Sequence, residues 1–177
     1  LGGQIVTTDG AQNTVRDYRT QLSKIKTANP DYIYMPLYAE GGTAAMSQLK
    51  DLGIKTKVFG GDAWSDPAFQ KGAAGKGDIL FAEVKTGENA DFSKKIMEKT
   101  KSTQVPVGAA QAYDAMKLAA QVMKKTGTNP DAFADELRKQ DYQGISGHIQ
   151  FDANGDLLNG LYIIKRVQAD GKVVEVK

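Results

Sequence analysis

Short apolar runs alternate along the chain with stretches in which apolar residues recur every three or four positions. The three- or four-residue spacing predicts helices at 14–27, 41–52, 67–72 and 91–101. The apolar runs have the length and composition of strands and lie at 1–8, 31–38, 56–59 and 78–84. Strands and helices that alternate in this way predict an α/β lobe with a doubly wound parallel sheet and right-handed crossovers.

The ends of several predicted helices carry recognisable signals. Pro30 disfavours helical geometry in Asn29 and should end the first helix. Gly53 is suited to the residue that closes the second helix, because glycine adopts the left-handed conformation without steric cost. Asp66 before Pro67 is a plausible N-cap followed by a first-turn proline.

The pattern changes after residue 106. Two predicted helices, 108–125 and 129–139, follow each other without a strand between them. The chain then becomes strand-like at 147–152, turns at 152–156, and ends in a predicted hairpin at 162–167 and 172–176. The apolar stripe of the first of these helices consists of Tyr113, Met116, Ala120 and Met123.

Composition removes several classes of function. The 177 residues contain no cysteine and one histidine, His148, so thiol chemistry and sites that need two imidazoles are excluded. The 23 basic and 21 acidic residues are interspersed and give a net charge of +2. This pattern does not indicate the basic surface with which proteins bind nucleic acid. No apolar run approaches the length of a membrane span.

The stretch from 57 to 67 carries the clearest candidate site. Gly60 and Gly61 follow a predicted strand, so Asp62 and Trp64 lie where a strand ends and a helix begins. Open α/β sheets bind ligands at the carboxyl ends of their strands. An acid beside an indole there could hold a cationic head group. The alternative is that Asp62 caps a turn and Trp64 fills an edge of the core.

Other constellations do not support catalysis or metal binding. The 152–156 stretch lacks the glycine and glutamate positions of a calcium loop, and the glycine-rich stretch at 72–77 lacks the spacing of a phosphate loop. Tyr113 and Asp114 are interpreted as a packed tyrosine and a first-turn acid. No nucleophile and base lie together in sequence. We therefore expect a protein that is not an enzyme and that uses no cofactor or metal.

Four motifs in order resemble those of a known family: Tyr38, the stretches at 60–67 and 112–115, and the stretch at 144–156. They resemble the substrate-binding proteins of ABC transporters for branched-chain amino acids, of the leucine/isoleucine/valine-binding type. The resemblance covers the C-terminal half of a family member. It implies a type I periplasmic-binding-protein fold, in which two α/β lobes are joined by three crossovers and enclose the ligand.

The resemblance also implies a role for each part of the chain. Residues 1–106 and 158–177 would belong to the second lobe, and residues 107–157 to the first. Asp62 falls where the family places the acid that receives the ligand's ammonium group. Tyr38 matches a cleft tyrosine at a strand end, and Trp64 would line the cleft beside the acid. Ala63 departs from the glycine that many members carry. The residues that grip the ligand carboxylate lie mostly in the other lobe, so the sequence does not fix which amino acid binds.

The expected function is to capture an amino acid and deliver it to an ABC transporter permease. Branched-chain amino acids are the first candidates for the ligand. The expected location is the periplasm or the outer face of the membrane. The alternative function is ligand sensing, because the same fold serves as the sensing domain of receptors and regulators. A small α/β enzyme is a third and weaker alternative. The chain also looks like the middle of a longer protein. If the resemblance holds, the apolar stripes of the helices after 106 should be covered by another copy of the chain, by a rearranged docking, or by a first lobe that was present and lost.

Overall fold

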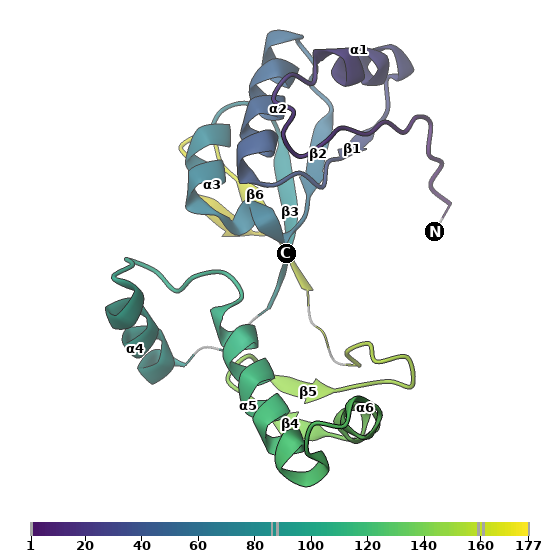
Figure 1. Ribbon diagram of the computed structural model, residues 1–177. Coiled ribbons are helices and arrows are strands. Elements are labelled where there is room, and N and C mark those ends of the chain that lie inside the picture. The colour runs from purple at the N-terminus through teal and green to yellow at the C-terminus, as the bar shows by residue number, and fades with distance from the viewer. Residues whose placement is uncertain (1, 86, 88, 159, 161, 177) are drawn as a thin grey trace. The chain divides into compact units, whose positions relative to one another are not determined.

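The computed structural model describes residues 2–85, 87, 89–158, 160 and 162–176 (Figure 1). These residues form two compact units. The first unit consists of residues 1–84 and 162–177, and the second of residues 85–161. No helix in the described ranges is long and apolar enough to cross a membrane. The predicted lobe assignment of 1–106, 107–157 and 158–177 refers to the whole protein and stays a prediction.

The first unit is built on a mixed five-stranded sheet. The predicted strands at 31–38, 56–59 and 78–84 supply three parallel neighbours, as expected, and the predicted terminal hairpin joins them in antiparallel fashion. The register places Ile33, Val58, Ile79 and Val167 on one face of the sheet. The order of the strands is β1 (Tyr32–Tyr34), β2 (Lys57–Gly60), β3 (Ile79–Val84), β6 (Tyr162–Val167) and β7 (Val173–Glu175).

Three helices of the first unit cover that face: α1 (Arg19–Ala28), α2 (Ala39–Asp51) and α3 (Pro67–Ala73). Their ends confirm the sequence signals. Asn29 adopts a left-handed conformation after α1, Gly53 has φ of 67° after α2, and the Asp66 carboxylate accepts the amide of Ala68 at 2.7 Å. Helices and strands together bury one cluster of 15 residues. Each large side chain in it stabilises the fold by about 1.5–3 kcal/mol relative to exposure.

The predicted strand at 1–8 is absent from the described part of the chain. Residues 2–10 have no strand assignment, and the side chains of Ile5 and Val6 are 84% and 55% exposed. An apolar run becomes a strand only where a neighbouring strand pairs with its backbone groups. The first helix also starts later than predicted, at Arg19, because residues 12–15 form a turn in which the Val15 amide bonds to the Gln12 carbonyl.

The described residues of the second unit form three helices and a two-stranded antiparallel sheet. Helices α5 and α6 pack against each other, and Asn129 caps α6 as its position before Pro130 suggests. The strand β4 was not predicted, since its three residues carry no apolar run. The elements are α4 (Ala90–Thr100), α5 (Ala109–Thr126), α6 (Pro130–Arg138), β4 (Asp141–Gln143) and β5 (His148–Gln150).

The predicted apolar stripe of α5 does not pack inside this unit. Tyr113, Met116, Ala120 and Met123 are exposed, and Met116 is the most exposed of the large ones at 73%. The residues that are buried lie on another face, at a spacing of four. The helix has two apolar stripes, and spacing alone did not distinguish the one that packs inside this unit. The buried residues are Ala110, Asp114, Leu118 and Val122.

Candidate functional site

Two of the three predicted site residues lie at one edge of the sheet in the first unit. Strands β1 and β2 are parallel neighbours, so their carboxyl ends meet at the same edge. Tyr38 follows β1 and Asp62 follows β2. This is the edge at which open α/β sheets bind ligands.

Tyr38 stands at the start of α2. It is the N-cap residue, with an extended backbone, and its carbonyl accepts the amide of Gly42 at 2.8 Å. Its side chain is 70% exposed, although tyrosine is a large, mostly apolar residue. The unpaired amides at a helix start attract negative charge, so a polar ligand beside this phenol would also lie close to the positive end of α2.

Asp62 is the first residue of a short 3₁₀ helix, η1 (Asp62–Ser65), directly after the Gly60–Gly61 turn. Its side chain is exposed. A carboxylate there is an acceptor for a charge-assisted hydrogen bond from an ammonium group. The structure therefore brings Asp62 and Tyr38 to one edge as exposed polar groups.

Trp64 does not share that exposure. Its side chain is fully buried, and the indole Nε1 donates to the Leu37 carbonyl at 2.9 Å. The ring stacks on Phe69 with centroids 4.3 Å apart. The indole thus offers no surface to a ligand within this unit, contrary to the expected contact. Its place matches the alternative drawn from the sequence, in which Trp64 fills an edge of the core.

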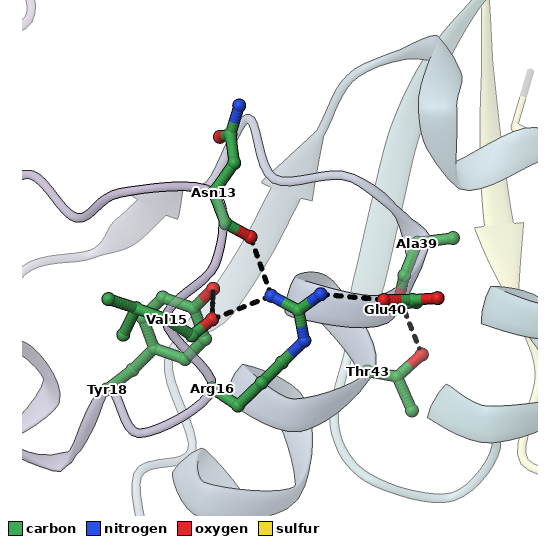
Figure 2. A network of polar contacts seen from close by, with 7 residues as sticks. All are labelled: Asn13, Val15, Arg16, Tyr18, Ala39, Glu40 and Thr43. Atoms are coloured by element: carbon green, nitrogen blue, oxygen red, sulfur yellow. Dashed lines mark hydrogen bonds and ion pairs between the residues drawn. The ribbon is translucent and has the colours of Figure 1, made fainter.

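A polar network that the sequence did not indicate holds the first turn of α2 (Figure 2). Arg16 Nη2 donates to Glu40 Oε2 at 2.6 Å, and Nη1 donates to the carbonyls of Asn13 and Val15 at 2.6 and 2.9 Å. Arg16 and Glu40 are 24 residues apart, so no local spacing could reveal the pair. The network ties the segment before α1 to the turn that begins with Tyr38.

Other residues singled out from the sequence have structural roles. Asp152 accepts the amides of Asn154 and Asp156 at 2.8 and 2.9 Å, as expected of a turn. These backbone hydrogen bonds, Asp156 first, lower the pKa of the Asp152 carboxyl. Among the described residues, no group of three or more histidine, aspartate or glutamate side chains is arranged to hold a metal ion.

Asp114 corrects the interpretation of the stretch at 113–114. It lies beyond the first turn of α5 and is fully buried, so it is not a first-turn acid. Its carboxylate accepts the amides of Ile145 and Ser146 and the hydroxyl of Ser146, at 3.0, 2.6 and 2.6 Å. Tyr113 is 43% exposed and meets Phe92 edge to face at 5.4 Å.

The fold and the exposed strand-end groups are those of a ligand-binding α/β protein. A family model described as "Periplasmic binding protein" matches residues 1–172, and the chain belongs to this family. The resemblance drawn from the four motifs and the expected fold class are thereby confirmed.

Relatives and solved structures agree with this placement. The chain is 23% identical, over 99% of its length, to the leucine-, isoleucine-, valine-, threonine- and alanine-binding protein of Pseudomonas aeruginosa. A leucine-binding protein of Thermotoga maritima superposes with a TM-score of 0.75 at 25% identity, over 93% of this chain. A branched-chain amino acid transporter substrate-binding protein of Streptococcus pneumoniae, solved with isoleucine, gives 0.64 at 25% identity over 92%. The chain spans 48%, 49% and 50% of these proteins, about half of each.

Proposed function

We propose that this chain is part of an extracytoplasmic solute-binding protein that captures an amino acid and delivers it to the permease of an ABC transporter. The names of its relatives, which bind branched-chain and other small amino acids, support this function. The observation that carries the proposal is the pair of exposed groups, Asp62 and Tyr38, at the carboxyl ends of neighbouring parallel strands.

Each group has a defined role in the proposal. The Asp62 carboxylate accepts a hydrogen bond from the ligand ammonium, and the Tyr38 phenol contributes a hydroxyl and an apolar ring to the same side of the ligand. The first lobe of the whole protein would supply most of the contacts to the ligand carboxylate. Binding would close the two lobes over the ligand, with the crossing segments absorbing the rotation. The protein would act in the periplasm or anchored outside the membrane.

The test uses the full-length protein. A thermal-shift screen against the twenty amino acids identifies ligands, and calorimetry measures their affinity. Losing a charge-assisted hydrogen bond costs roughly 1.5–3 kcal/mol, so Asp62→Asn should weaken binding about tenfold or more. Asp51→Asn removes an exposed carboxylate from the last residue of α2 and serves as the matched control. Unchanged affinity in Asp62→Asn would overturn the assignment of the ammonium contact.

Tyr38→Ala should weaken binding more than it lowers the melting temperature, because an exposed side chain contributes little to the core. A large loss of melting temperature with intact affinity would make Tyr38 a packing residue only. A ligand-sensing domain would also bind amino acids, so transport is tested separately, by uptake assays with the cognate permease. Amino acid binding without any effect on uptake would favour the sensing alternative.

A further inference from the structure

The indole of Trp64 occupies a space that two glycines leave open. A Cβ atom at Gly60 would come within 2.2 Å of the ring carbon Cε3, and one at Gly42 within 2.8 Å of Nε1. No side chain is tolerated at such distances without movement of the ring. Gly60 ends β2, and Gly42 lies in the first turns of α2, so the two elements that carry the proposed site both leave room for one ring.

The ring is also bonded to the backbone next to Tyr38. Its Nε1 donates to the carbonyl of Leu37, the residue before Tyr38, at 2.9 Å. Leu37 and Gly42 lie on either side of Tyr38 in sequence. The Leu37 carbonyl is bonded to the indole, and the indole also occupies the space that a side chain at Gly42 would need. Trp64 itself lies two residues after Asp62 within the same short 3₁₀ helix, whose turn is closed by the Trp64 amide and the Gly61 carbonyl at 3.1 Å.

We propose that Trp64 is a positioning residue that fixes the Tyr38 turn and the Asp62 turn relative to each other. This inference rests on the proposed function and assigns Trp64 a role without ligand contact. The buried ring sets the separation of the two turns, and its N–H bond holds the Leu37 carbonyl in place. The indole therefore sets the distance between Asp62 and Tyr38, and a ligand that contacts both residues needs that distance to be correct.

Hydrogen exchange in the ligand-free, full-length protein tests the positioning by itself. Trp64→Phe keeps an aromatic ring but removes the N–H donor, leaving the Leu37 carbonyl without its partner. Phe81→Leu is the control, since Phe81 is also fully buried in the same core but belongs to β3. The exchange rates of each variant are first corrected for its loss of global stability. After this correction, the 38–43 amides should exchange roughly fivefold faster or more in Trp64→Phe than in Phe81→Leu. Equal exchange in the two variants would overturn the inference.

Ligand affinity tests the consequence for the site. Trp64→Phe should weaken amino acid binding by roughly five- to tenfold, while Phe81→Leu should leave it within about twofold. Unchanged affinity in Trp64→Phe would overturn the link between the indole and the site. If no amino acid binds the native protein, the proposed function fails, and the exchange data still decide whether Trp64 holds the two turns.

A substitution of the same shape guards against failure to fold. Incorporating β-(3-benzothienyl)alanine at position 64 places sulfur where the indole has N–H and keeps the volume of the ring. It should reproduce the faster exchange of the 38–43 amides with little change in melting temperature. Native exchange rates in that variant would show that packing alone, without the bond to Leu37, orders the turn, and would overturn the role given to the N–H group.

Discussion

The two compact units are stabilised in different ways. The first unit buries one continuous cluster of 15 residues between its sheet and three helices. In the described part of the second unit, the buried hydrophobic side chains are Ala110, Leu118 and Val122, all on α5. The first unit thus has the kind of core that stabilises a domain, and the second has a small one.

The second unit contains a buried carboxylate beside its small apolar core. Asp114 is fully buried and accepts three hydrogen bonds from residues 145 and 146, which offset the cost of removing its charge from water. The backbone approaches so closely that a Cβ atom at Gly144 would lie 2.3 Å from Asp114 Oδ2. One α/β chain thus combines a unit with a large apolar core and a unit with a polar centre, the hydrogen-bonded Asp114 carboxylate.

The largest effects should come from matched core deletions in the two units. Leu49→Ala in α2 removes a fully buried side chain from the large cluster and should cost about 3–5 kcal/mol. Leu118→Ala in α5 should cost about 2–3 kcal/mol, because fewer buried neighbours surround it. Chemical denaturation of the full-length protein, followed by hydrogen exchange in each unit, measures both. Equal costs would remove the contrast between the units.

Removing the polar centre should have the next largest effect. Asp114→Asn keeps the shape but turns one acceptor into a donor facing the Ser146 amide, so it should destabilise the second unit by about 2–3 kcal/mol. Ser146→Ala removes only the hydroxyl bond and should cost about 1 kcal/mol. Faster hydrogen exchange confined to residues 109–150 would confirm the effect. An Asp114→Asn protein as stable as the parent would show that apolar packing suffices there.

The exposed stripe of α5 should affect association more than stability. Met116 and Met123 are 73% and 45% exposed, and an apolar stripe of this kind marks a surface that another element covers. In the 177-residue chain alone, Met116→Gln combined with Met123→Gln should reduce self-association in light scattering while changing the free energy of unfolding by less than about 0.5 kcal/mol. An isolated chain that is monomeric before substitution and binds leucine with micromolar affinity would contradict the expectation that this helix needs covering.

The smallest effect should come from the ion pair at the start of α2. Arg16 and Glu40 have side chains 46% and 81% exposed, so their attraction is screened and Arg16→Ala should cost less than about 1 kcal/mol. The segment stays attached through Gln48, which accepts the Tyr18 amide and donates to the Arg16 carbonyl, each at 2.7 Å. Gln48→Ala should therefore cost more than Arg16→Ala, by melting temperature. The reverse order would identify the ion pair as the main attachment.

The sequence predicted those parts of the fold that local patterns determine. The strands at 57–60 and 79–84 are apolar runs that lie between helices in the sequence. Gly53 follows α2 with a positive φ and Asp66 caps α3, as their residue types predict. The strand expected at 1–8 failed because pairing depends on a neighbour that no local pattern describes. The spacing also did not show that α5 packs inside its unit through a different face from the predicted stripe.

The candidate site was predicted only in part, because local patterns place some of its residues and not others. Asp62 and Tyr38 follow apolar strands, so their place at the sheet edge could be inferred from order alone, whereas their roles toward a ligand stay predictions. The sequence left open whether Trp64 lines a cleft or fills the core, because its burial depends on Gly42, which lies 22 positions earlier on another element. Similarly, Asp114 gave no sign of its partners at 145 and 146, which lie 31 and 32 residues away.

The space shared by Gly42, Gly60 and Trp64 limits how this protein can change over generations. A smaller residue at position 64 opens room at both glycines, and a side chain at either glycine displaces the indole. Changes at the three positions should therefore arise together or in a fixed order, with the tryptophan lost first. In a library randomised at all three, survivors should either keep the full set of two glycines and tryptophan or replace the tryptophan by a smaller residue.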